Sequence, residues 1–190
     1  MAGQNVVGLD IGTSSIKVCQ LKETKKGTYL VAFDSIVLPP ETIRDGQVMH
    51  APQLSERIQE VFGLNKIRNR RAAISLSGHS VIIKKISLPE MTVEELEDSI
   101  QWEAEQYIPF DIKDVNVDAQ IINPHAGQGQ MDVLLVAAKR AVIEEFAEVV
   151  RDARVDPAVV DVDAFALFNC FELNHEVPRD ETVALVNIGA

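Results

Sequence analysis

The residues best suited to chemistry lie near the N-terminus, in the segment from Val6 to Lys17. A short apolar run leads there to a carboxylate, a glycine, three hydroxyl side chains and a lysine. The glycine permits a tight turn and a close approach of the backbone to a ligand. Hydroxyls and an ammonium suit phosphate oxygens, and a carboxylate suits Mg²⁺ held through water, without direct coordination by the protein. We therefore predict a phosphate-binding β-hairpin whose contact residues are Asp10, Gly12, Thr13, Ser14, Ser15 and Lys17.

Other interpretations of this segment make different demands on the sequence. A Walker A loop needs a glycine and a lysine in a fixed spacing before a helix, and that pattern is lacking. An aspartic protease needs two carboxylates that share a proton, whereas the second copy of the pattern has Asn187 in place of an aspartate. A plain surface hairpin with small polar turn residues stays open at this point.

The second copy of the pattern lies at the end of the sequence, over residues 183–190. It again runs from an apolar strand through a polar residue and isoleucine to a glycine and a small residue. Two such loops are typical of two lobes that hold a phosphate between them, so we expect Asn187 and Gly189 to face the first loop. The second lobe is then expected to be mostly missing from these 190 residues.

The elements that must position both loops follow from apolar periodicity. We expect an α/β fold, with strands over 6–10, 16–21, 29–38 and 72–76 and a helix over 52–62. An α+β insert then carries strands over 81–88, 115–121 and 133–137, a hairpin loop over 125–130, a helix that Thr92 and Glu95 begin as a capping box, and a helix over 142–153. A strand over 159–162, a helix over 164–173 and a strand over 182–188 complete the chain. The expected divisions are 1–78, 79–157 and 158–190.

Composition sets the class of protein. The chain has 190 residues, with 18 Lys and Arg against 29 Asp and Glu, a formal net charge of −11 and 46% hydrophobic residues. The negative charge argues against nucleic acid as a partner, because binding of phosphate backbones needs a surplus of basic residues. Two cysteines, Cys19 and Cys170, favour a reducing, cytoplasmic compartment. No apolar run is long enough for a membrane span, and no histidine has metal-ligand spacing.

Two charged segments and one aromatic residue each leave two interpretations open. The segment 86–112 has eight acidic residues and no Lys or Arg, which is typical of a solvated helix face or of a docking face for a basic segment. The basic cluster of Lys66, Arg68, Arg70 and Arg71 indicates a solvated loop or a contact with anionic lipid or protein. Trp102 falls between positions of the apolar stripe, so it is either an exposed anchor or packed against the neighbouring hairpin.

These motifs together resemble a known superfamily. The hairpin from Asp10 to Lys17 resembles the first phosphate loop of the superfamily of actin, heat-shock chaperones and sugar kinases, and 187–190 is similar to the start of its second phosphate loop. The insert resembles subdomain 1C of FtsA-type proteins, which interrupts a ribonuclease-H-like subdomain 1A. The stretch Glu-Ala-Glu-Gln-Tyr-Ile-Pro-Phe at 103–110 is close to a hallmark of the type IV pilus assembly PilM family.

The resemblance implies a cytoplasmic, actin-like assembly protein of the type IV pilus machine, peripheral to the inner membrane through its partners. It implies binding of the cytoplasmic N-terminal tail of the inner-membrane protein PilN in a groove between subdomains 1A and 1C, and a link to the platform protein and motor ATPases. ATP and Mg²⁺ are implied only with the second lobe, with at most weak ATPase activity and no catalytic residue. A nucleotide-independent peptide-binding scaffold and a small-metabolite kinase of the same superfamily are the alternatives.

Overall fold

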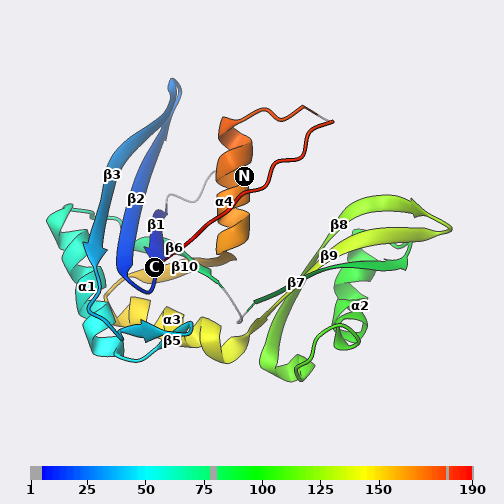
Figure 1. The fold of residues 1–190 in the computed structure, drawn as a ribbon, viewed down its shortest axis with the longest axis horizontal. Coiled ribbons are helices and arrows are strands. Elements are labelled where there is room, and N and C mark those ends of the chain that lie inside the picture. Colours follow the sequence, from blue (N-terminus) through cyan, green and yellow to red (C-terminus); the bar gives the residue numbers. More distant parts are fainter. Residues whose placement is uncertain (1–5, 78–80, 179, 190) are drawn as a thin grey trace. The chain divides into compact units, whose positions relative to one another are not determined.

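A computed structural model describes residues 6–77, 81–178 and 180–189 of the chain (Figure 1). The chain divides into two compact units. The first unit is built from two separate stretches, residues 1–77 and 145–190, and the second unit is the stretch 78–144 between them. Both units combine helices with β-sheet, which confirms the predicted mixed α/β architecture. The predicted insert, 79–157, is longer than the second unit, because residues 145–157 belong to the first unit, whose sheet the strand after residue 155 joins.

A five-stranded sheet with the strand order β10-β6-β1-β2-β3 forms the centre of the first unit. Three consecutive antiparallel strands make one side, and two strands parallel to β1 complete the other. Apolar residues alternate with polar ones along β1 and β2, so that one face of the sheet is buried. The strands are β1 (Val7–Ile11), β2 (Ser15–Thr24), β3 (Gly27–Val37), β6 (Arg71–Leu76) and β10 (Asp156–Val162).

Helix α1 (Ala51–Leu64) packs against β2 and β3. It begins with a proline in its first turn, where the missing amide hydrogen costs nothing. Its apolar face is fully buried and consists of Leu54, Ile58, Val61 and Phe62. The helix follows a two-stranded hairpin of β4 (Ile43–Arg44) and β5 (Gln47–Val48). This helix carries the chain from β3 across to β6, so that β6 lies parallel to β1.

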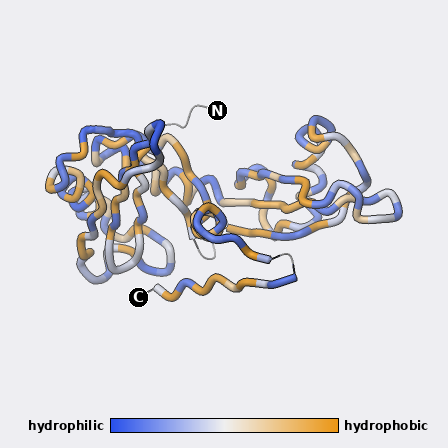
Figure 2. Tube along the Cα trace, turned by 90° about the horizontal axis from the view of Figure 1, so that it is seen from above, coloured by the Kyte–Doolittle hydropathy of each residue, from blue (hydrophilic) through white to orange (hydrophobic). Residues whose placement is uncertain are grey.

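The later part of the first unit contains most of helix α3 (Arg140–Asp152) and all of helix α4 (Asp163–Asn174). The first turn of α3 belongs to the second unit. Helix α4 packs against β6 and β10. The predicted last strand, 182–188, is wrong, because the structure assigns no strand in residues 181–189. A strand forms only against a neighbour that pairs with its backbone. This apolar segment, visible in Figure 2 before the C-terminus, instead remains exposed.

The second unit is a three-stranded antiparallel sheet, in the order β7-β9-β8, with a helix on it. Helix α2 (Val93–Glu105) packs against β8 and buries Leu96, Ile100 and Ala104. The predicted capping box is confirmed: the Thr92 hydroxyl accepts from the Glu95 amide at 3.2 Å, and the Glu95 carboxylate accepts from the Thr92 amide at 2.8 Å. The strands are β7 (Val81–Pro89), β8 (Val115–Gly127) and β9 (Gln130–Lys139).

The hairpin between β8 and β9 is tighter than the sequence indicates. The predicted loop covers 125–130, yet β8 extends to Gly127 and only Gln128 and Gly129 form the turn. Gly127, Gln128 and Gly129 all have positive φ. Glycine adopts such a conformation without strain, and it occupies two of these three positions. A short helical turn, η2 (Ile112–Asp114), precedes β8.

Candidate functional site

The predicted phosphate-binding segment forms the turn between β1 and β2. These two strands pair antiparallel, with Asp10 opposite Lys17 and Ile11 opposite Ile16. The Gly12 amide donates a hydrogen bond to the carbonyl oxygen of Ser15 at 3.0 Å, which closes the turn. The predicted β-hairpin is therefore present.

Asp10 and Lys17 contact each other directly. The Lys17 ammonium nitrogen lies 2.8 Å from Asp10 Oδ2, and the two side chains are 46% and 55% exposed. The cross-strand register causes this contact, because residues opposite one another in a pair of strands project their side chains to the same face. The sequence predicted both residues as ligand contacts, and the structure brings them together as an exposed ion pair.

Gly12 is required by the turn itself. A Cβ atom at this position would lie 3.2 Å from the Ser15 carbonyl oxygen, which is tighter than most such contacts. That oxygen accepts the hydrogen bond from the Gly12 amide, so it has little freedom to move away. The turn is also attached to the end of β3, because the Leu38 amide donates to the Ser14 carbonyl oxygen at 2.8 Å. Thr13 and Ser14 are exposed at the tip.

The second predicted loop has a different character. Asn187 and Gly189 lie in an exposed segment to which the structure assigns no helix or strand, and Ala190 lies outside the described residues. A strand–turn loop like that of β1 and β2 is therefore not formed by residues 181–189. The same segment does approach α4, since Val183 and Leu185 line a pocket together with Phe168 and Phe171 of that helix.

Nothing in the sequence indicates two features near the sheet, the hydrogen bond between Asn65 and Asp34 and the environment of the Cys19 thiol. The Asn65 amide nitrogen donates to Asp34 Oδ2 at 2.7 Å and to the Val61 carbonyl oxygen at 2.9 Å, which ties β3 to the end of α1. This hydrogen bond, followed by one from the Ser35 amide, lowers the pKa of Asp34. Burial, and to a lesser degree the neighbouring Cys170, raises the pKa of the Cys19 thiol.

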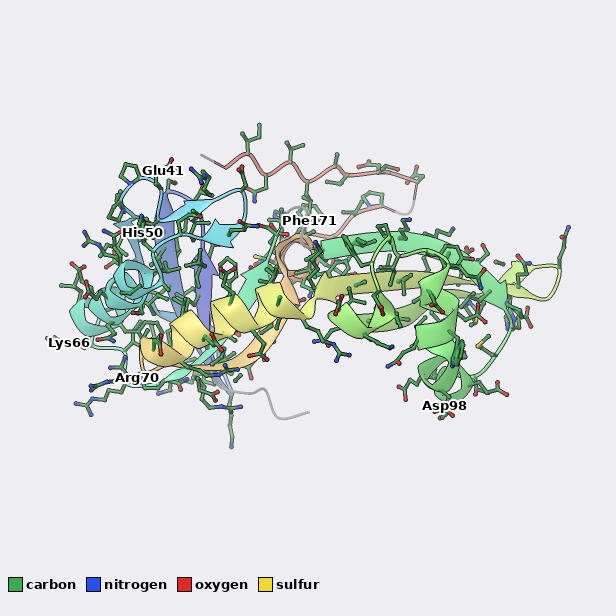
Figure 3. All side chains as sticks on the ribbon, turned by 90° about the horizontal axis from the view of Figure 1, so that it is seen from below. Glu41, His50, Lys66, Arg70, Asp98 and Phe171 are labelled. Carbon is green, nitrogen blue, oxygen red and sulfur yellow. The ribbon has the colours of Figure 1, made fainter. Side chains whose placement is uncertain are left out.

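The sequence left two interpretations open for Trp102, for the acidic segment 86–112 and for the basic cluster, and the structure shows where each of them lies. Trp102 is exposed, with 77% of its surface accessible. Asp98 lies at the surface of α2 (Figure 3), and seven of the eight acidic residues over 86–112 are exposed, Glu103 being half-buried. Two residues of the basic cluster make contacts within the first unit. The Arg70 guanidinium lies 5.5 Å from the centre of the Phe62 ring, and Arg71 Nε lies 3.7 Å from an Asp156 carboxylate oxygen.

Among the described residues, no three or more His, Cys, Asp or Glu side chains are grouped so that they could hold a metal ion. Among these same described residues, no helix combines the length and the apolar character that crossing a membrane requires. The fold is thus a mixed α/β protein of two units, in which a strand–turn–strand loop carries an acid and a base on one sheet face.

The chain belongs to the family of the type IV pilus assembly protein PilM, because the model of that family matches residues 8–190. The resemblance predicted from residues 103–110 is confirmed by this match. A solved structure described as a PilM–PilN type IV pilus biogenesis complex is similar to the chain, with 32% identity and a TM-score of 0.76. The match covers 86% of this chain and 48% of that one, so the chain spans about half the length of the chain it matches in that complex.

A second similar structure is the cytoplasmic domain of EpsL, an inner-membrane component of the type II secretion system of Vibrio cholerae. It is 14% identical, with a TM-score of 0.53, and the match covers 85% of this chain and 58% of that domain. At this identity the likeness shows that the fold is shared.

Proposed function

We propose that this chain acts in type IV pilus assembly, as part of an actin-like protein that binds the cytoplasmic tail of a PilN-type inner-membrane protein. The observation that carries the proposal is the match to the PilM family over residues 8–190, together with the similarity to a PilM that was solved as a complex with PilN. In this proposal the first unit corresponds to subdomain 1A and the second unit to subdomain 1C.

The proposed task is mechanical coupling in the cytoplasm. The tail binds to the protein, which is held at the inner face of the inner membrane through this partner. It connects the inner-membrane alignment proteins to the platform protein and the motor ATPases. The negative charge of the chain, with 29 acidic against 18 basic residues, supports a protein tail over a nucleic acid as the partner.

ATP with Mg²⁺ is the proposed conformational ligand, with at most weak hydrolysis. The turn at Gly12 supports this, since its tight backbone leaves Thr13 and Ser14 exposed at the tip beside Asp10 and Lys17. A phosphate would draw the Lys17 ammonium away from Asp10, and Asp10 would then hold the metal ion through water. Asn187 and Gly189 are proposed to approach the phosphates from the opposite side.

A nucleotide-independent scaffold is the second candidate. The Lys17–Asp10 ion pair favours it, because the two groups that would bind phosphate and metal neutralise each other at 2.8 Å. In that case the hairpin serves the fold alone, and partner binding does not respond to nucleotide.

Calorimetric titration of the chain with a synthetic peptide of the partner's N-terminal cytoplasmic tail tests the proposal. We expect saturable binding, with none for a peptide of the same composition in scrambled order. Equal heats for both peptides would contradict the proposed partner. The same titration on the protein of full family length, with and without ATP and for Lys17→Ala, separates the two candidates. A dependence on ATP that Lys17→Ala abolishes supports the nucleotide ligand, and an unchanged affinity throughout supports the scaffold.

A further inference from the structure

The second unit concentrates its positive charge at one pocket. Residues 78–144 contain twelve Asp and Glu but only five Lys and Arg. Two of the five bases contact other residues of this unit. The Lys84 ammonium donates to the Tyr107 carbonyl oxygen at 2.8 Å, and the Lys85 ammonium pairs with the Asp132 carboxylate at 2.8 Å. The other three bases, Lys113, Lys139 and Arg140, line a single pocket of about 390 Å³.

The walls of this pocket combine an aromatic ring with ordered cations. The Lys139 ammonium lies 4.2 Å from the centre of the Phe110 ring, a geometry that holds the charge over the ring face. The Arg140 Nε donates to the Val115 carbonyl oxygen at 3.0 Å, which fixes the plane of the guanidinium. Ala141 completes this side of the wall.

The pocket also lies at the beginning of α3. A helix of 13 residues starts at Arg140, and its first turn contains no acidic residue. The N-terminal end of a helix carries a partial positive charge, and here the charges of Lys139 and Arg140 add to it. The acids in the lining are Asp111 and Asp114, and Asp111 Oδ1 already accepts from the Lys113 amide at 2.9 Å. The lining therefore has a small net positive charge within an acidic unit.

We propose that this pocket binds the carboxylate of an aspartate or glutamate side chain from a protein partner. The planar guanidinium of Arg140 matches a carboxylate through two parallel hydrogen bonds, and Lys113 and Lys139 supply the remaining charge. A single negative charge balances the net charge of +1 that three bases and two acids give the lining. The volume falls within the range of sites for organic groups, about 300–1,000 Å³.

This inference goes beyond the proposed function and does not depend on it. The test is a nuclear magnetic resonance titration of the isotope-labelled 190-residue chain with the blocked peptide acetyl-Leu-Glu-Leu-amide. We expect saturable shifts of the backbone amides of Lys113, Lys139, Arg140 and Ala141, and a weaker affinity as salt is added. The matched probe acetyl-Leu-Gln-Leu-amide, which keeps the shape and lacks the charge, is expected to leave these amides unshifted.

Substitutions in the pocket complete the test. Arg140→Gln and Lys113→Gln are each expected to weaken the binding about tenfold, the effect of losing a charge-assisted hydrogen bond. Lys85→Gln removes the same charge outside the pocket and is expected to leave the affinity unchanged. Arg140→Lys keeps the charge without the fork, so it gives a further variant if Arg140→Gln fails to fold.

Three outcomes would overturn the inference. One is the absence of saturable shifts at these amides with the glutamate peptide, and another is an equal response to the glutamine peptide. The third is saturation of the pocket by inorganic phosphate alone while the glutamate peptide has no effect, which would make it a phosphate site.

Discussion

Lys17 stands directly opposite Asp10 in the ladder of β1 and β2, and its ammonium nitrogen lies 2.8 Å from Asp10 Oδ2. About half of each side chain is exposed to solvent, so the pair contributes little to stability. The two residues most suited to binding phosphate and metal are thus in contact with each other, on two strands whose turn is closed by the hydrogen bond from the Gly12 amide to the Ser15 carbonyl oxygen.

The first prediction concerns this ion pair. Lys17→Ala is expected to change the free energy of unfolding by less than about 1 kcal/mol, because exposed ion pairs are worth that or less. Urea denaturation measures the change, with Asp10→Asn as the matched variant. A loss well above this value would mean that the pair is structural, and that its proposed role in nucleotide binding has to be separated from folding.

The second prediction concerns the turn. Gly12→Ala is expected to destabilise the chain by about 1 kcal/mol or more, because the new Cβ would press on the fixed Ser15 carbonyl oxygen. Gly63 gives the matched control: a Cβ there would meet nothing within 4 Å, and the residue lies in α1. Gly63→Ala is expected to stabilise the chain by up to about 1 kcal/mol, through helix propensity. Equal effects in thermal unfolding would refute the assigned role of Gly12.

The third prediction concerns the pKa of Asp34. Asn65→Ala removes the hydrogen bond that chiefly lowers this pKa, so the pKa should rise toward the ordinary aspartate value of about 3.9. Carbon-detected titration of the carboxyl groups measures it. The pKa of Asp132, which is lowered chiefly by its hydrogen bond with Lys85, should not change and serves as the internal control.

The same hydrogen bond has a consequence for stability at acid pH. The folded-state pKa of Asp34 is lowered, so its contribution to stability is present above the unfolded-state pKa and is lost as the pH falls through the folded-state pKa. Asn65→Ala should therefore show a smaller loss of stability between pH 5 and the acid limit, roughly the range in which paired carboxylates lose their contribution. An identical acid dependence in both proteins would contradict the assignment.

The fourth prediction concerns the start of α2. Thr92→Ala removes the hydroxyl that accepts from the Glu95 amide and should cost about 1 kcal/mol. Thr92→Ser retains the acceptor and should remain close to the parent in chemical denaturation. If both variants lose the same stability, then the threonine methyl group, and not the cap, is responsible.

The sequence by itself determined the features that depend on neighbouring residues. The alternation in β1 and β2, the apolar stripe of α1 and the capping box at Thr92 are set within a few residues of each element, so periodicity and spacing were sufficient to predict them. The stretch 103–110 likewise identified the PilM family from local sequence alone.

Only the tertiary structure decided what depends on partners distant in the chain. Residues 182–188 have the composition of a strand, but strand formation requires a neighbouring backbone, and spacing says nothing about whether one is present. The contact between Asp10 and Lys17 depends on the register of two strands. The gathering of Lys113 with Lys139 and Arg140 depends on the pairing of β8 with β9, which sets Val115, just after η2, opposite Lys139. Charge and shape at a site are sums over residues that folding brings together, which is why the pocket had no signal in the sequence.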